Sequence, residues 1–153
     1  MNSEEKNHLL EYCEREVEDK LERIQSEIER GKQALSGESK SSAGDKHETA
    51  RAMAQLEMEK AGQRYNQVLP MRLVCRQIRA NFNGSEESVV RLGSLVRSGG
   101  KFYFLAISLG LVNISSQKYI VVSPKSPLGA GLIGKTIGDL NSFNGEKIEE
   151  IFN

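Results

Sequence analysis

The chain contains no tryptophan, and aromatic residues make up only 6% of its 153 residues. Proline and cysteine are scarce as well, with three and two residues. Thick globular cores usually hold more large aromatic side chains, so this composition favours thin helical elements over a single compact globule. The two cysteines, Cys13 and Cys75, are too few for a disulfide framework and lack the spacing of a metal site, so we interpret both as small buried apolar residues.

The chain also lacks a net charge and long apolar runs. Its 21 Lys and Arg residues balance 21 Asp and Glu residues, so no overall field draws it toward nucleic acid or an anionic membrane. No run of about 18 apolar residues is available to span a membrane, and the first residues do not have the pattern of a secretion signal. We therefore expect a cytoplasmic monomer of one or two small domains that makes no contact with a membrane.

The charges that are present are unevenly distributed. Residues 1–35 carry a net charge of −4, residues 36–80 of +3 and residues 81–153 of +1. Residues 1–80 hold a single proline and long tracts of helix-forming residues, whereas the rest is rich in short alternations of Gly, Ser, Val, Ile and Phe. Turn residues gather at 81–85 and mark the boundary. The sequence thus predicts an α+β protein, with a helical domain over residues 1–80 and a β-rich domain over residues 81–153.

Apolar and small residues recur along the helical part in alternating steps of four and three, which is typical of a coiled-coil seam. One run starts at Val17, and a second starts at Ala54. The two runs mirror each other about residues 44 and 45, because the numbers of paired positions always add to 89. The pairs are Leu35 with Ala54, Gly31 with Met58, Ile28 with Ala61, Ile24 with Tyr65 and Leu21 with Val68. This symmetry predicts an antiparallel coiled-coil hairpin with its tip near residues 36–48.

The chemistry of the turn agrees with that position. Residues 36–44 are rich in types that end helices, and Asp45 with Glu48 has the spacing of a capping box that opens a second helix. The arm from the start of the seam to the tip would be on the order of 40 Å long. Pro70 lacks a backbone donor, so we expect the paired seam to end near it and a separate helical piece to follow over residues 71–79.

Four runs in the second half predict strands, with a tight hairpin turn at residues 98–100 between the first two. The predicted strands are Val89–Val96, Lys101–Ile107, Tyr119–Ser123 and Lys147–Phe152.

A short helix is predicted between the last two of these strands. Ser126 is suited to the N-cap, Pro127 to the first helical position and Gly134 to a left-handed stop. Residues 129–136 also match the phosphate-loop pattern G-x-x-x-x-G-K-[ST]. A phosphate loop needs a long helix that begins at its Lys-Thr, and turn-forming residues follow Thr136 instead. We interpret the match as fortuitous.

Two motifs are similar to those of a known family. The first comprises the stretch from Ser126 through Gly134-Lys135 to Gly138-Asp139, which is close to S-P-x-G-x-A-L-x-G-K-x-x-G-D. The second is the predicted tip, where residues 44–48 read G-D-K-H-E and are similar to G-D-x-x-E. With the order of the two halves, these motifs resemble the bacterial Gre transcript-cleavage factors over nearly the whole chain. The resemblance implies a coiled-coil hairpin followed by an FKBP-like domain with a short helix.

The resemblance also implies a partner and a mode of action. The C-terminal domain would dock at the rim of the secondary channel of bacterial RNA polymerase, through Ser126, Pro127, Leu128 and Gly129. The hairpin would then reach the active centre and the 3′ end of backtracked nascent RNA. The protein is therefore expected to activate the nuclease activity of the polymerase and not to be an enzyme itself.

Asp45 and Glu48 are the candidate catalytic and metal-ligating residues. Carboxylates three residues apart on one helical turn can face the same ion, and two-metal phosphodiester cleavage needs added oxygen ligands for a weakly held Mg²⁺. The resemblance implies that they hold this Mg²⁺, shared with the polymerase site, and orient the attacking water. Helix capping alone, at about 1 kcal/mol, remains an alternative role for the pair. Lys40, Lys46 and Arg51 flank the pair, either as contacts for RNA phosphates or as solvated surface charges.

The tip also departs from the family pattern. Where many members continue with N-A-E-Y, this chain places Arg51 at the acidic position and Ala52 at the aromatic one. This reversal of charge suggests a second hypothesis, a Gre-like regulator that occupies the channel and inhibits or modulates transcription without stimulating cleavage. A third hypothesis, an FKBP-like prolyl isomerase, has little support, because the chain has no Trp to line a pocket. It would have to rely on the phenylalanines Phe82, Phe102, Phe104 and Phe143.

Overall fold

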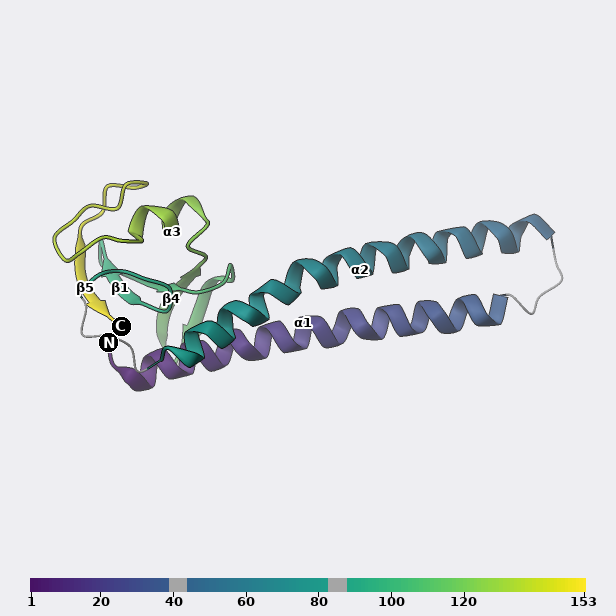
Figure 1. The fold of residues 1–153 in the computed structure, drawn as a ribbon, viewed down its shortest axis with the longest axis horizontal. Coiled ribbons are helices and arrows are strands. Elements are labelled where there is room, and N and C mark those ends of the chain that lie inside the picture. The colour runs from purple at the N-terminus through teal and green to yellow at the C-terminus, as the bar shows by residue number, and fades with distance from the viewer. Residues whose placement is uncertain (39–43, 83–87) are drawn as a thin grey trace. The chain divides into compact units, whose positions relative to one another are not determined.

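The computed structural model describes residues 1–38, 44–82 and 88–153, with side chains described for all of these except residues 38 and 44–47. Two long helices, α1 (Ser3–Glu38) and α2 (Gly44–Ala80), precede a five-stranded mixed sheet that carries one short helix, α3 (Pro127–Leu132) (Figure 1). The protein is therefore α+β, as the sequence predicts. No helix in the described ranges is both long and apolar enough to cross a membrane.

The chain forms two compact units. Unit 1 comprises Met1–Arg15 and Leu73–Asn153, and unit 2 comprises Glu16–Arg72. The division falls inside both long helices, because the first turns of α1 and the last turns of α2 pack in the same unit as the sheet. The predicted boundary at residue 81 follows the end of α2 instead, and it stays a prediction about domains.

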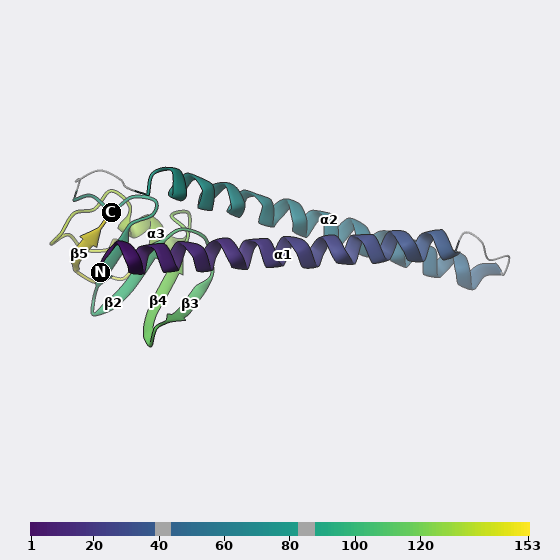
Figure 2. The ribbon, with the colours of Figure 1, turned by 90° about the horizontal axis from the view of Figure 1, so that it is seen from below.

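Unit 2 consists of two helical segments that run in opposite directions side by side (Figures 1 and 2). The predicted seam positions are all buried or half-buried, whereas most positions between them are exposed. Gly31 lies against Met58, since a Cβ atom on Gly31 would be 2.5 Å from Cγ of Met58. The side-chain amide of Gln25 donates to the Tyr65 hydroxyl at 3.4 Å. The predicted pairing of Gly31 with Met58 is thus found in the structure.

Polar contacts flank the seam. The Arg72 guanidinium makes two hydrogen bonds to the Glu18 carboxylate, at 2.7 and 2.8 Å, and these bonds raise the pKa of Arg72. Arg64 pairs with Glu27 further along the helices. Both contacts join α1 to α2, so they reinforce the opposite direction of the two helices.

Residues 71–79 are helical as predicted, but the break expected at Pro70 is wrong, because α2 continues through it to Ala80. A proline deprives the carbonyl four residues earlier of its helical partner. Here Pro70 and Asn66 both lie on the exposed side of the helix, where water can satisfy the Asn66 carbonyl. Exposure therefore reduces the cost that the sequence pattern alone suggested.

The sheet of unit 1 has the strand order β3-β4-β2-β1-β5. Its neighbouring strands are antiparallel except for the parallel pair β2–β4. The strands are β1 (Leu95–Ser98), β2 (Lys101–Leu105), β3 (Gly110–Ile114), β4 (Gln117–Val122) and β5 (Ile148–Phe152). Four correspond to predicted strands, although β1 begins later than predicted and Val89 makes only an isolated bridge to Thr136. The sequence prediction missed β3.

Each face of the sheet is covered within unit 1. On one face a core cluster includes Val96, Tyr103 and Leu105 from the sheet and Leu132 from α3. On the other face Phe104 is fully buried. The first turn of α1 reaches the residues that follow α2 and β5, since Lys6 Nζ donates to the carbonyl oxygens of Phe82 and Asn153 at 3.2 and 3.0 Å. Cys13 and Cys75 are buried in the same unit, as predicted.

The predicted turn and cap of unit 1 are confirmed. Gly99 and Gly100 form the two-residue turn between β1 and β2, with φ angles of 56° and 73°. Ser126 caps α3, because its Oγ accepts from the Gly129 amide at 3.1 Å, and Pro127 is the first helical residue. Gly134 follows the helix with a φ of 77°. Local residue chemistry therefore fixed both features.

Candidate functional site

The candidate catalytic pair lies at the end of unit 2 where α2 begins. Asp45 is the second residue of α2, and Glu48 follows one turn later with an exposed side chain. Residues three apart on a helix share a face, with Cβ atoms about 5–6 Å apart. The side chain of Asp45 lies outside the described part of the structure, so the pairing of the two carboxylates stays a prediction.

The position of the pair favours negative charge. The first turn of a helix presents unpaired N–H groups and the positive end of its dipole, which stabilise carboxylates there. The helix begins at Gly44, one residue before the predicted cap. In the described parts of the chain, no group of three or more His, Cys, Asp or Glu side chains is arranged to hold a metal ion.

Of the three basic residues that flank the pair, the structure describes the side chain of one. Arg51 is exposed in α2, three residues after Glu48. Lys46 belongs to the first turn of α2 by its backbone, but its side chain is outside the described residues, and so is the whole of Lys40. Their contacts to RNA remain predictions.

The predicted docking residues form the start of α3. The Ser126 hydroxyl donates to the Ser123 carbonyl at 2.7 Å and also accepts from the Gly129 amide, so both its donor and its acceptor are used within the fold. Gly129 is buried, and a Cβ atom there would lie 2.0 Å from the Ser123 carbonyl oxygen. Leu128 packs against the core cluster, which leaves Pro127 as the exposed member of the four. Most of this motif thus has a structural role in shaping the helix.

The phosphate-loop match does not form a phosphate loop. Its first glycines belong to α3, and no helix begins at Lys135 or Thr136. The amide and the hydroxyl of Thr136 instead donate to the Asp139 carboxylate at 2.8 and 3.0 Å, and these two bonds lower the pKa of Asp139. The Gly-Asp of this motif therefore closes a turn.

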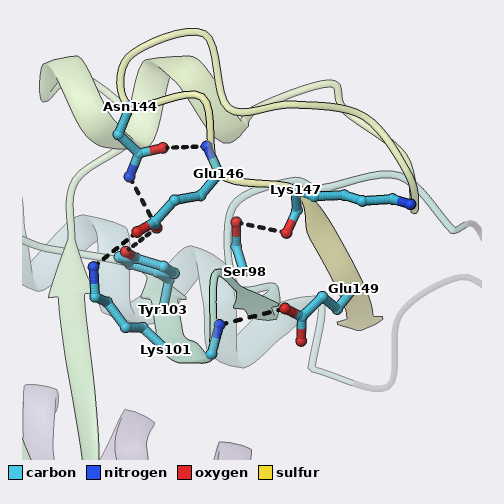
Figure 3. A network of polar contacts seen from close by, with 8 residues as sticks. Ser98, Lys101, Tyr103, Asn144, Glu146, Lys147 and Glu149 are labelled. Carbon is cyan, nitrogen blue, oxygen red and sulfur yellow. Dashed lines mark hydrogen bonds and ion pairs between the residues drawn. The ribbon is translucent and has the colours of Figure 1, made fainter.

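A polar network that the sequence prediction missed surrounds Glu146 (Figure 3). Its carboxylate accepts from Lys101 Nζ at 2.8 Å, from the Tyr103 hydroxyl at 3.0 Å and from the Asn144 amide at 3.0 Å. Burial and the neighbouring carboxylate raise the pKa of Tyr103 to about 12. The lysine hydrogen bond is the main cause that lowers the pKa of Glu146. Tyr103 therefore keeps its proton and donates it to the carboxylate, and the network joins the loop before β5 to β2.

The phenylalanines considered for an isomerase pocket differ in their exposure and in their contacts. Phe102 contacts the Tyr119 ring, with centroids 5.9 Å apart, and Phe104 is fully buried. Phe143 is 61% exposed, whereas Phe82 lies under the Lys6 ammonium at 4.8 Å.

The sequence was also compared with known proteins. No protein-family model matches the chain, and no curated protein matches it.

Proposed function

We propose that this protein is a Gre-like transcription elongation factor that enters the secondary channel of bacterial RNA polymerase and stimulates cleavage of backtracked RNA. In this proposal α1 and α2 form an antiparallel coiled-coil hairpin, and the sheet with α3 is an FKBP-like domain. The observation that supports it is the seam of unit 2. It is continuous from Val17 to the end of α1, and α2 opens at its far end with Asp45 and Glu48.

The chemistry of this position fits the proposed role. Mg²⁺ usually keeps several waters and takes only one or two protein carboxylates together with phosphate oxygens. An exposed acidic turn with two carboxylates matches that requirement, provided that the polymerase and the RNA supply the remaining ligands. Bound there, Mg²⁺ would supply charge stabilisation for the phosphodiester being cut. Asp45 and Glu48 would hold the ion and orient the attacking water.

A transcript-cleavage assay on stalled, backtracked polymerase complexes tests the proposal. Wild type is expected to shorten the RNA, and the variant with Asp45→Asn and Glu48→Gln is expected to lose at least about tenfold in rate, since removing one charge-stabilising group commonly costs that much or more. The matched control is the variant with Glu29→Gln and Glu57→Gln, which removes two exposed carboxylates of unit 2 away from the first turn of α2. Equal cleavage by the two double variants would refute the role of the pair.

Arg51 favours the second candidate function, a channel-occupying regulator that does not stimulate cleavage. Its cation is exposed one turn beyond Glu48, where it competes with a metal ion for the carboxylates. On this alternative, wild type binds the polymerase and slows transcription without cutting. Arg51→Glu is then expected to create or increase cleavage. Absence of any complex with the polymerase would exclude both functions.

A further inference from the structure

The strand that the sequence prediction missed forms a free edge of the sheet. β3 is the last strand in the order, and its Leu111 side chain is 62% exposed. The two-residue turn at 115 and 116 makes Ile114 and Gln117 the closing pair of the β3–β4 hairpin. Main-chain groups alternate between partner and edge in an antiparallel ladder. Counting from Ile114, the N–H and C=O groups of Leu111 and Asn113 therefore point to the free edge.

An open groove of about 530 Å³ lies where β2 begins and the β3–β4 hairpin turns, and Leu111 of β3 is part of its lining. Its lining combines apolar side chains with cations and polar groups, and none of the described residues that line it is acidic. The residues that matter here are Lys101, Phe102, Leu111, Ser116, Lys118 and Ile120. Such a lining is complementary to a ligand that carries both an apolar group and a negative charge.

The register of the strands separates the apolar and the cationic parts of the groove. Leu111 pairs with Ile120, and Asn113 pairs with Lys118. Because side chains alternate along a strand, these four lie on one face, in two rows separated by two residues. Lys101 Nζ is already 2.8 Å from a Glu146 carboxylate oxygen. The exposed ammonium of Lys118 is therefore the cation that the groove offers to a ligand.

We propose that β3 binds an extended, acidic segment of a partner protein as a sixth strand. An apolar side chain of this segment lies beside Leu111, and a carboxylate two residues away lies beside Asn113, from where the long Lys118 side chain of β4 reaches it across β3. In antiparallel addition the carboxylate precedes the apolar residue. The edge groups of β3 supply main-chain hydrogen bonds, and the two rows of the groove supply specificity. A nucleic acid has no peptide main chain to pair with this edge, so a protein segment fits better. The inference rests on unit 1 and not on the proposed function.

Two capped peptides of identical composition test the spacing. Thr-Thr-Glu-Thr-Val-Thr-Thr places its Glu and Val on one face of a strand, whereas Thr-Thr-Thr-Glu-Val-Thr-Thr places them on opposite faces. Titrated into the ¹⁵N-labelled full chain, the first is expected to shift amide resonances of β3 and β4 and to slow hydrogen exchange at Leu111 and Asn113. The second is expected to bind about tenfold more weakly, because it loses one contact of roughly 1.4 kcal/mol. Equal binding, no binding, or shifts confined to other elements would overturn the proposal.

Variants of the full chain test separately the contributions of the lysine, the main-chain edge and the apolar residue to peptide binding. Lys118→Glu is expected to abolish the preference for the first peptide, whereas Lys125→Glu, a matched change at an exposed lysine outside the groove, should leave it unchanged. Asn113→Pro removes a donor from the free edge and should weaken both peptides. Since this variant can also perturb folding, Leu111→Lys provides a second test of the same edge. Self-association of wild type through β3, or binding of oligouridylate to the groove in place of the peptide, would count against a partner protein.

Discussion

Unit 1 and unit 2 bury their apolar side chains in different ways. In unit 1 a sheet with covered faces encloses residues such as Leu95, Phe104 and Leu132, all with no exposed surface. In unit 2 two helices share one seam, and burial declines along it from Leu21 at 1% exposed to Leu35, which is half-buried. Two helices cover each other on one side only, so a two-helix seam stays open at its margins. The stability of unit 1 therefore depends on how well its side chains fit together. The stability of unit 2 depends on how much apolar surface each seam residue buries.

The two units also differ in how exposed their polar contacts are. The Arg64–Glu27 pair of unit 2 has side chains that are 52% and 41% exposed, and exposed pairs contribute little to stability. The Glu146 carboxylate of unit 1 is 24% exposed and accepts hydrogen bonds from three other side chains. We therefore expect polar substitutions to matter more in unit 1 than in unit 2.

The largest effect is expected for Gly129→Ala in unit 1. The added Cβ would lie 2.0 Å from a backbone oxygen, and backbone cannot move aside cheaply, so the free energy of unfolding should fall by about 3 kcal/mol. Gly62→Ala is the control in α2, where a Cβ would meet nothing within 4 Å. It should raise stability by about 0.5–1 kcal/mol, because alanine favours a helix. Urea unfolding measures both, and a similar sign for the two would contradict the contrast.

The second-largest effect on stability is expected to differ between the two ends of the seam. Leu21→Ala removes a fully buried side chain and should cost about 2–3 kcal/mol. Leu35→Ala removes a half-buried one and should cost about half as much, because less apolar surface is lost. Urea unfolding followed by circular dichroism compares them. Equal losses would mean that the seam is as closed at residue 35 as it is at residue 21.

Pro70→Ala should stabilise unit 2. Alanine restores the hydrogen bond to the Asn66 carbonyl within α2, so we expect a gain of about 1–3 kcal/mol, less than the full interior cost of proline because the site is exposed. Pro127→Ala is the matched control, since proline at the first position of a helix sacrifices no helical bond. Thermal unfolding of both variants tests the contrast. A loss of stability in Pro70→Ala would show that the proline serves the packing of this helix.

The smallest effect concerns the network at Glu146. Folding lowers the pKa of this carboxyl below 4.5, so its contribution to stability is present above pH 4.5 and is lost as the pH falls through the lower folded value. Glu146→Gln should therefore be less stable than wild type at pH 7, and the difference should shrink in acid. Tyr103→Phe removes one hydrogen bond to the same carboxylate and should cost about 1 kcal/mol. A difference between Glu146→Gln and wild type that is constant from pH 7 to pH 3 would rule out this role for the carboxylate.

Local signals in the sequence predicted several elements correctly, and their absence explains what was missed. The glycines at 99 and 100 and the capping Ser126 act through backbone conformation and one nearby hydrogen bond, so neighbouring residues suffice to recognise them. The turn before β4 consists of Ser115 and Ser116, whose φ angles are 49° and 68°. Serine gives no signal for that conformation, unlike Asn-Gly. The strand β3 was therefore hidden from the sequence prediction.

The candidate site and its surroundings also contain features that the sequence could predict and features that it could not. The position of Asp45 and Glu48 in the first turn of α2 follows from the mirrored seam and the turn residues, so the sequence was enough to predict it. The structural role of Gly129 was not predictable, because it depends on the carbonyl of Ser123 approaching within the space of a single Cβ. The groove beside β3 was not predictable either, since it requires the register that pairs Asn113 with Lys118.

What the sequence determined by itself is the periodicity of the two helices, the start of the second helix close to Asp45, and the cap and turn of unit 1 that residue chemistry specifies locally. These depend on spacing and backbone preference, which are properties of neighbours in the chain. Only the tertiary structure decided which glycine is indispensable, which carboxylate collects three donors and which strand remains at the edge. Those outcomes depend on contacts between residues distant in sequence, and a linear pattern does not encode the distances between them.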